Sequence, residues 1–371
     1  MKGKCFFIAI PGNTAAVSKQ FMELSNVLAL RGHRVVILIS GQRKHKEQHA
    51  TNPSIYTWPS KRPINFRDGA FLFRLIKMYR PDCLIANFGA VNIMMLLGWL
   101  MRVHCRIAWH HTLSEQIFID INNMSKLRMR YLNLRKNIIY KMATHIVPVS
   151  NVVRLDVHHM HHVPLSKCQV IHNSLVDPWQ NLNEQKRVMA KRIKIICVAR
   201  LEISKGQDIL IKAIALLQKH FPDITAEFVG EGYARNTYLK LSSDLNLDGI
   251  CNFIGALSHD NVLKHMSYSY VTVVPSINEA FGLVNIESMA VGTPVIASNI
   301  GGIPEIIRDG IDGFLFQVGN HESLAEKLFL LLKNPDLRET MGKNARQRFL
   351  DKFELKNSVS QQVEWLERIM P

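Results

Sequence analysis

Two glutamates, Glu279 and Glu287, stand on either side of a Phe281-Gly282-Leu283 turn that leads into an apolar, helix-like stretch. The first turn of a helix offers unpaired backbone N–H groups and the positive end of its dipole, and both suit a phosphate. The amides of Phe281, Gly282 and Leu283 are therefore expected to hold a diphosphate. Because eight residues are slightly more than two helical turns, both carboxylates are expected to address the same site.

The two acids call for different partners. A carboxylate beside a phosphate would repel it, so Glu287 is expected to accept hydrogen bonds from ribose hydroxyls, one layer deeper. Glu279 comes earlier in the chain, where a transferred sugar and its β-phosphate would lie. Phosphate and hydroxyl groups bound at one helix start describe a site for a nucleotide sugar. The alternative is a capped, buried helix that carries an incidental acid.

Arg200 and Lys205 form a second candidate pair. They follow the strand-like run Lys194–Ala199 and lie at a predicted helix start. Open parallel sheets bind ligands beyond the carboxyl ends of their strands. There the two cations could neutralise a diphosphate leaving group, Arg200 as a planar fork and Lys205 as a point charge. Alternatively, they are a solvated pair at the end of a strand.

Composition narrows the class of protein. With 371 residues the chain predicts two domains. Six scattered cysteines without a C-x-x-C pair favour reduced thiols in a cytosolic compartment. The apolar run Cys5–Ile10 is too short for an export signal, and Ala90–Met101 is too short to span a bilayer.

The charge is distributed unevenly along the chain. Residues 1–180 hold about 24 Lys and Arg against 8 Asp and Glu, whereas the remainder holds about 22 of each. The formal net charge of +16 therefore lies in the first half. Such an asymmetry indicates the partners of a protein rather than its fold.

Strand-like runs alternate with helical segments in both halves, which predicts parallel sheets built from βαβ units. The expected fold class is α/β, with two Rossmann-like, doubly wound domains facing each other across a cleft. The predicted domains are residues 1–177 and 193–352, joined by a linker at 178–192, and a C-terminal helix at 353–371 is expected to cross back to the N-terminal domain. The predicted strands are Lys4–Ile10, Arg34–Ile39, Cys83–Ala86, Arg106–Trp109, His145–Val149, Gln169–His172, Lys194–Ala199, Ala226–Val229, Cys251–Ile254, Val271–Val274, Pro294–Ala297 and Phe314–Phe316.

Four segments together resemble the retaining glycosyltransferases of the GT-B type with a paired-glutamate E-x7-E motif, the family 4-like class also called glycosyl transferases group 1. The segments are Val198–Leu217, Phe228–Gly232, Pro275–Glu305 and Asp309–Phe316. The resemblance covers roughly residues 165–350. The N-terminal half matches more loosely, since Pro11-Gly12-Asn13-Thr14 stands where the family usually has a double glycine. The resemblance implies the GT-B fold, with the donor on the C-terminal domain and the acceptor on a basic, membrane-facing N-terminal domain.

The resemblance also implies roles for individual residues. Arg200 and Lys205 would hold the pyrophosphate, while Glu287 would bind ribose and Glu279 the donor sugar. His111 would take the family's histidine position near the reacting sugar, with His110 as its immediate rival. The predicted catalytic residues are thus Glu279, His111, Arg200 and Lys205. Donor-binding residues are also predicted. The loop of Gly12 would close on the phosphates, and Gly230, Ile254 and Gly255 would flank the nucleobase. The other predicted donor-binding residues are Arg200, Lys205, Glu279, Ala280, Phe281, Gly282, Leu283 and Glu287.

No Asp-x-Asp triplet occurs in the chain. A metal-dependent transferase of the other main fold would need one to hold a divalent ion, so neither a metal nor a cofactor is predicted. Arg200, Lys205 and the helix N–H groups would take the place of the metal. The resemblance implies retention of the anomeric configuration by same-face attack, with the departing phosphate as the base.

The segment Lys126–Lys141 carries cations and no acid, with Leu127, Tyr131, Leu134 and Ile138 along one face. A basic amphipathic helix of this kind is typical of anionic membrane surfaces. The alternative is an ordinary packing helix with extended Lys and Arg side chains. The run His158–His162 is interpreted as a surface segment that gains charge below about pH 6.5, not as a metal site. No recognition motif indicates nucleic acid.

These features predict a cytoplasmic enzyme, peripheral at the inner face of the cytoplasmic membrane, that moves a sugar from a nucleotide-diphosphate sugar to a glycan or lipid-linked acceptor. UDP is the favoured nucleotide on family frequency, and cell-surface polysaccharide or lipopolysaccharide biosynthesis is the expected pathway. The alternatives are a soluble small-molecule glycosyltransferase, a sugar-nucleotide epimerase on the same fold, and a non-catalytic membrane-binding scaffold. The presence of both glutamates and both cations argues against the scaffold.

Overall fold

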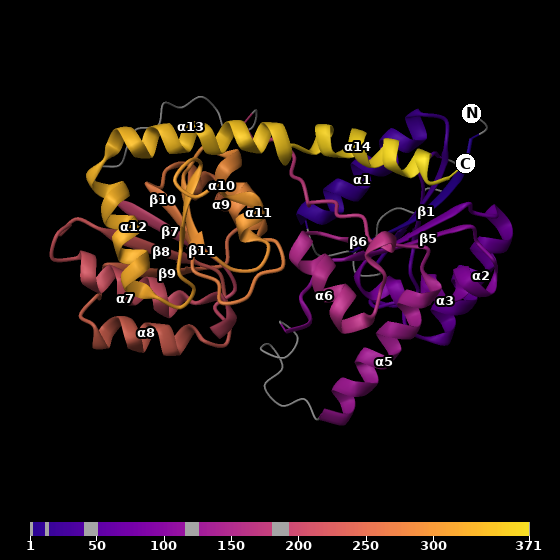
Figure 1. The fold of residues 1–371 in the computed structure, drawn as a ribbon, viewed down its shortest axis with the longest axis horizontal. Coiled ribbons are helices and arrows are strands. Elements are labelled where there is room, and N and C mark those ends of the chain that lie inside the picture. Colours follow the sequence, from indigo (N-terminus) through magenta and orange to yellow (C-terminus); the bar gives the residue numbers. More distant parts are fainter. Residues whose placement is uncertain (1–2, 12–14, 41–50, 116–125, 180–192, 371) are drawn as a thin grey trace. The chain divides into compact units, whose positions relative to one another are not determined.

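The computed structural model describes residues 3–11, 15–40, 51–115, 126–179 and 193–370. Contacts divide the described chain into two compact units (Figure 1). The N-terminal unit contains the described residues up to Ser114, those of 126–176, and the C-terminal residues from Leu355 onward. The C-terminal unit contains Glu115 and the described residues of 177–354. Gly12 and most of the predicted linker lie outside the described residues.

The N-terminal unit is built on a sheet of six parallel strands. Its inner strands are buried on both faces and therefore read as continuous apolar runs, as in the sequence CFFIAI of the first strand. Across the sheet the order is β3 (Ser54–Thr57), β2 (Arg34–Ile39), β1 (Cys5–Ile10), β4 (Cys83–Ala86), β5 (Cys105–His110) and β6 (His145–Pro148).

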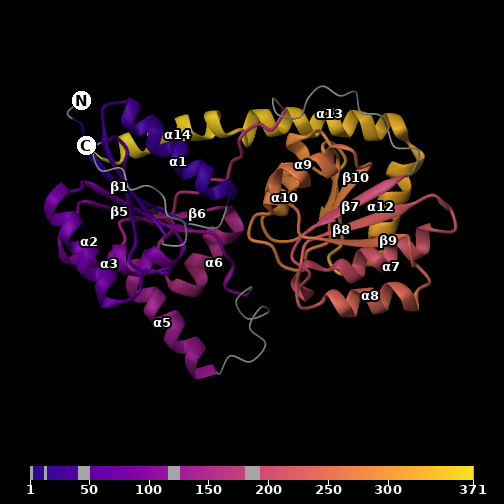
Figure 2. The ribbon, with the colours of Figure 1, turned by 180° about the vertical axis from the view of Figure 1, so that it is seen from behind.

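Helices cover both faces of this sheet (Figures 1 and 2). On one face α1 (Ala15–Leu30) packs against β1, β2 and α14 (Leu355–Arg368). On the other, α3 (Val91–Leu100) packs against β4 and β5 and is flanked by α2 (Phe66–Tyr79) and α5 (Lys126–Met142). A further helix, α6 (Asn151–His161), contacts β6 and α5.

The C-terminal unit repeats this plan with a second sheet of six parallel strands. One face is covered by α7 (Gln207–Leu217), α8 (Arg235–Asp244) and α12 (His321–Lys333), the other by α9 (His259–Ser267) and α10 (Leu283–Ala290), with α13 (Pro335–Lys352) packed on α10 (Figure 2). The strand order is β12 (Gly313–Phe316), β11 (Val295–Ser298), β10 (Val271–Val274), β7 (Lys194–Val198), β8 (Thr225–Val229) and β9 (Cys251–Gly255).

Each sheet has one point where the strand order reverses. In the N-terminal unit it lies between β1 and β4, and in the C-terminal unit between β7 and β10. The chain leaves the two strands of such a pair toward opposite faces of the sheet, and ligands of doubly wound sheets bind at this opening. The fold therefore defines, within each unit, the edge at which functional side chains are expected.

The α/β class and its two parallel, doubly wound sheets confirm the sequence prediction. One predicted strand was wrong, and one observed strand was not predicted. Gln169–His172 is not a strand, because only Cys168 forms a bridge to β6 and the chain then makes two isolated hydrogen bonds along that edge. The short strand β3 was missed. Its four residues are too few to show a periodic pattern of apolar side chains. Asn52, just before the strand, holds it in position, because its side chain forms hydrogen bonds with the backbone of His33 and Val35.

Close packing of α13 gives a stability prediction. A Cβ added to Gly342 would lie 2.6 Å from the backbone oxygen of Gly292, so Gly342→Ala must push the helix away from that turn. We expect a loss of about 1–3 kcal/mol in the free energy of unfolding, measured by chemical denaturation. Gly69→Ala in α2 is the control, because its nearest neighbour lies at 3.9 Å. A helical alanine with room should leave stability unchanged or raise it.

Candidate active site

The carboxyl ends of five neighbouring strands in the C-terminal unit carry most of the predicted donor-binding residues. Arg200 follows β7, Gly230 follows β8, Ile254 and Gly255 end β9, and Glu279 follows β10. All these strands are parallel, so their carboxyl ends meet at one edge. The fifth strand, β11, contributes the glycine turn at residues 301–302.

An ion pair lies at the point of strand reversal. Lys205, in a short 3-10 turn after β7, places its Nζ 2.9 Å from Glu279 Oε2 in the loop after β10. The two side chains are only 12% and 16% exposed. The Ser276 hydroxyl donates to the same carboxylate oxygen at 3.3 Å. An ammonium group has three donors, so Lys205 can hold Glu279 and still offer N–H groups to an anion.

Backbone contacts allow the two loops to approach this closely. The Ile277 N–H donates to the Ser204 carbonyl at 2.9 Å. Gly206 has φ +65°, and a Cβ there would lie 2.1 Å from the Pro275 oxygen. Gly301 has φ +58°, and its Cβ would lie 1.8 Å from the Glu279 oxygen. Any side chain at either glycine would force Glu279 away from Lys205.

The helix α10 begins at Leu283, with Gly282 as its N-cap at φ +96°. No side chain caps this end. The Asn285 N–H donates to the Gly282 carbonyl at 3.1 Å, and the amides before it point toward whatever precedes the helix. Phe281 lies outside the helix, and its ring is buried against Phe353.

The helical-spacing argument for the two glutamates was wrong. Glu279 lies in the loop before Gly282, whose left-handed backbone ends any continuous helix there, and only Glu287 is on α10. Glu279 reaches the site through the contact of its loop with Lys205 and Gly301 instead.

Glu287 is a nearly buried carboxylate with a partner that the sequence did not reveal. His259 Nε2, at the first position of α9, lies 3.0 Å from Glu287 Oε1. An N-cap serine at position 258 begins α9 directly after β9 and its turn. The signal that was available is a histidine at a helix start following a predicted strand.

Arg200 is placed differently from Lys205. Its side chain is 59% exposed and pairs with Glu202 at 2.6 Å. An exposed pair of this kind contributes little to stability, so Arg200 remains available to a ligand as a solvated group. Beside it, Gly230 packs so tightly that a Cβ would lie 2.0 Å from the Ala199 oxygen. Ile254 is partly exposed and Gly255 takes φ +78° at the end of β9.

In the N-terminal unit, His111 lies at the carboxyl edge of β5. Its Nε2 is 3.0 Å from Asn87 Oδ1, whose amide in turn donates to the Ala9 carbonyl at 3.0 Å. Because that amide is the donor, the Asn87 oxygen accepts and Nε2 carries the hydrogen. The ring stacks on Phe88 with centroids 4.4 Å apart. Burial lowers the pKa of His111 to about 3, so the imidazole is neutral near pH 7.

Asn87 and Phe88 were missed by sequence reasoning. They follow β4, across the reversal point from β1, and the rule that placed Arg200 after β7 would have found them. Phe88 is exposed and has φ +47°. A bulky residue rarely adopts this backbone, and such outliers cluster at functional sites.

His110, the rival of His111, lies in a buried polar cluster. Its Nδ1 contacts the Tyr140 hydroxyl at 2.7 Å, and its Nε2 lies 3.4 Å from Lys136 Nζ. Burial and the charge of Lys136 lower the pKa of His110 well below its usual range. The nearby His161 is buried, with its Nδ1 2.8 Å from Asn137 Oδ1. The prediction that His158–His162 is a surface segment was therefore wrong for His161, which faces inward from α6.

In the described part of the chain, no cluster of three or more His, Cys, Asp or Glu side chains has the arrangement of a metal site. Among the described helices, none combines the length and apolar character that crossing a membrane requires.

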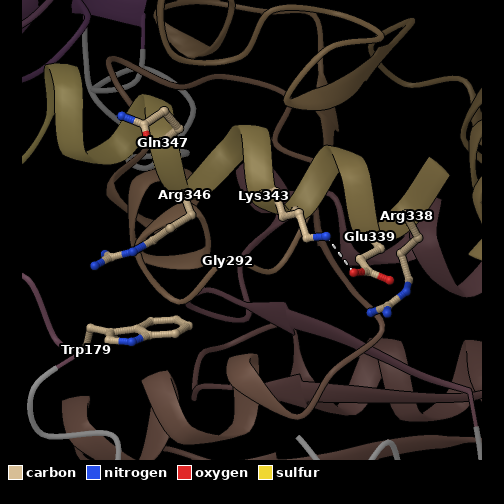
Figure 3. A pocket seen from close by; sticks show the side chains of 8 residues that line it. Trp179, Gly292, Arg338, Glu339, Lys343, Arg346 and Gln347 are labelled. Carbon is tan, nitrogen blue, oxygen red and sulfur yellow. Dashed lines mark ion pairs between the residues drawn. The ribbon is translucent and has the colours of Figure 1, made fainter. Parts of the chain in front are cut away.

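A pocket of about 360 Å³ lies at the opposite end of α10 from Gly282, since its wall includes Gly292 (Figure 3). Two of its cations are already paired, Arg346 with Asp177 at 2.6 Å and Lys343 with Glu339 at 2.7 Å. The pocket therefore lies away from the carboxyl ends of the strands, where Lys205 pairs with Glu279. Its lining residues are Trp179, Gly292, Arg338, Glu339, Gly342, Lys343, Arg346 and Gln347.

Two family models match the chain in succession. The model described as Glycosyltransferase Family 4 matches residues 17–176, and the model described as Glycosyl transferases group 1 matches residues 180–348. Together with the two parallel doubly wound sheets, these matches show that the chain belongs to the glycosyltransferases of the GT-B type.

Particular relatives agree with this assignment. An uncharacterized glycosyltransferase of Haemophilus influenzae is 27% identical over 93% of this chain and 95% of its own length. An uncharacterized glycosyltransferase of Methanocaldococcus jannaschii is 29% identical over 59% of this chain, which spans only 58% of that relative. Among solved structures, Anabaena HepE in complex with UDP superposes with a TM-score of 0.77 at 20% identity, over 98% of this chain and 100% of that chain.

The buried histidine of α6 gives a pH prediction. Burial, reinforced by the charge of Lys136, lowers the pKa of His161 to about 3. Between pH 6.5 and 3 the unfolded chain binds a proton that the folded chain does not, so the free energy of unfolding must fall as pH falls. The slope for one such histidine is at most about 1.4 kcal/mol per pH unit.

Denaturation of His161→Gln at pH 7.5 and pH 5.5 tests this expectation. This variant should lose less stability on acidification than the wild type does. The matched control is His159→Gln, an exposed neighbour on the same helix, which should lose as much as the wild type. Equal losses in all three proteins would contradict the assignment.

Proposed function

We propose that the protein is a retaining, metal-independent glycosyltransferase that uses a nucleotide-diphosphate sugar, with UDP as the favoured nucleotide. The observation that carries the proposal is the Lys205–Glu279 pair beside the uncapped start of α10. A cation and a helix N-terminus at one sheet edge suit a diphosphate, and the carboxylate suits sugar hydroxyls. The UDP bound to HepE supports the choice of nucleotide.

In this proposal each residue has a defined task. The diphosphate departs with the electrons of the bond to the sugar C1, and Lys205 and Arg200 balance its charge. The acceptor oxygen forms the new bond to C1 on the same face, and its proton passes to the departing phosphate. Glu279 orients the donor sugar, and Glu287 accepts hydrogen bonds from the ribose. His111, held neutral, serves as a hydrogen-bonding group for the sugar rather than as a charge.

Lys205→Met tests the donor site. The variant removes the cation and leaves the Glu279 carboxylate to repel a diphosphate, so we expect the affinity for UDP to fall at least about tenfold in isothermal titration calorimetry. Lys212→Met is the matched control. That lysine pairs with Asp208 on the exposed face of α7, so its loss should leave UDP affinity unchanged. Wild-type affinity in Lys205→Met would refute the donor site.

We further propose that the acceptor is a glycan or a lipid-linked sugar of cell-surface polysaccharide or lipopolysaccharide assembly, reached at an anionic membrane on the cytoplasmic side. The supporting feature is α5. Ile139 and Tyr140 are buried against the N-terminal unit, whereas the four apolar side chains of the other stripe are exposed: Leu127, Tyr131, Leu134 and Ile138. Exposed arginines at 128, 130 and 135 lie beside them. An apolar stripe with flanking cations and no acid suits anionic lipid.

Vesicle co-sedimentation tests the membrane contact. Replacing Arg128, Arg130 and Arg135 by Gln removes about 1 kcal/mol of attraction per cation, so the variant should dissociate from phosphatidylglycerol vesicles while it keeps UDP affinity. The charge-matched control replaces Lys219, Lys240 and Lys264 of the C-terminal unit, which are also exposed. If both triple variants dissociate equally, net charge and not α5 is responsible.

A further inference from the structure

The pair formed by His259 and Glu287 suggests a function that the roles above leave unexplained. His259 Nε2 lies 3.0 Å from Glu287 Oε1, and the side chains are 32% and 10% exposed. An ionised carboxylate only accepts hydrogen bonds, so Nε2 must carry the hydrogen and donate it. The histidine therefore holds one oxygen of Glu287 in place, and little solvent reaches this carboxylate to compete for the hydrogen bond.

The orientation of Glu287 matters for its proposed task. A carboxylate that accepts hydrogen bonds from two neighbouring ribose hydroxyls must present its oxygens in one direction. A site that is preorganised in this way discriminates strongly against a ligand that lacks one hydroxyl, since a nearly buried acceptor is then left unpaired. Without its partner, Glu287 can rotate and its preference for the complete diol weakens.

The packing of α9 does not depend on this hydrogen bond. Val262, Leu263 and Met266 anchor α9 in a buried cluster with Val291. The Thr293 hydroxyl also donates to the Met266 carbonyl at 2.8 Å. A merely structural role, holding α9 against α10, is thus already filled by other contacts.

We propose that His259 is a positioning residue that orients Glu287 and thereby makes the site selective for a ribonucleoside over a 2′-deoxyribonucleoside diphosphate. The proposal rests on the proposed function, because it assumes that Glu287 faces the ribose. Beyond that function, it gives a role to His259 on α9 and predicts a preference for the ribonucleoside that can be measured.

The same helix supplies a matched control. His265 Nδ1 lies 2.9 Å from Glu227 Oε2, and those side chains are 34% and 19% exposed. This second His–Glu pair joins α9 to β8 instead of α10, so its distance and exposure match the first pair while its position does not. Glu227 also pairs with Lys194 at 2.9 Å, so the loss of His265 removes a contact of α9 while Glu227 keeps a partner.

The experiment measures the dissociation constants of UDP and 2′-deoxy-UDP by calorimetry on the full chain. The proteins are the wild type, His259→Ala, His259→Gln and His265→Ala, with thermal unfolding as the check on folding. We expect His259→Ala to weaken UDP binding about tenfold and 2′-deoxy-UDP binding much less, so that the ratio of the two constants approaches one. His259→Gln keeps an N–H near the position of Nε2 and should retain most of the wild-type ratio. His265→Ala should keep the wild-type ratio.

The outcomes separate the two claims. If UDP does not bind the wild type, both the proposed function and this inference fall. If UDP binds but His259→Ala keeps the wild-type ratio, only the inference is overturned. Equal weakening of both ligands by His259→Ala is this same outcome and would indicate a general effect on the fold. The inference is also overturned if His265→Ala changes the ratio as much as His259→Ala does.

Discussion

The ion pair between Lys205 and Glu279 is the interaction on which the C-terminal site depends. It joins two loops that leave neighbouring strands, β7 and β10, toward opposite faces of the sheet. With both side chains largely buried, loss of either partner would strand a charge, which typically costs about 3–5 kcal/mol. The pair is possible only because Gly206 and Gly301 let backbone approach backbone. The same glycines therefore control the position of a carboxylate several residues away from them.

The reversal points of the two units differ in their electrostatics. In the C-terminal unit a lysine, two glutamates and a helix start gather at one edge, so this edge presents charge of both signs. In the N-terminal unit the corresponding position holds Asn87, Phe88 and a neutral His111. The positive excess of that unit thus lies elsewhere, including the exposed arginines of α5.

Sequence reasoning succeeded where one local signal was sufficient. Buried parallel strands read as apolar runs, and cations or acids that follow such runs are placed at the ligand edge by the topology alone. It failed where a contact joins distant segments. The spacing of eight positions from Glu279 to Glu287 predicted two turns of helix, but Gly282 breaks the helix between them. The sequence could place His259 at a helix start, but not next to Glu287, which comes 28 residues later in the chain.

The sequence by itself determined the α/β class, the alternation of strand and helix, the family, and most of the polar side chains that follow the strands of the second sheet. These follow from periodicity and from residue types that lie next to one another in the chain. Only the tertiary structure decided which groups touch: Lys205 with Glu279, Glu287 with His259, His111 with Asn87, and His161 inside instead of outside. The physical reason is that strand order brings together loops that are far apart in sequence, and burial then decides which of their charges need a partner.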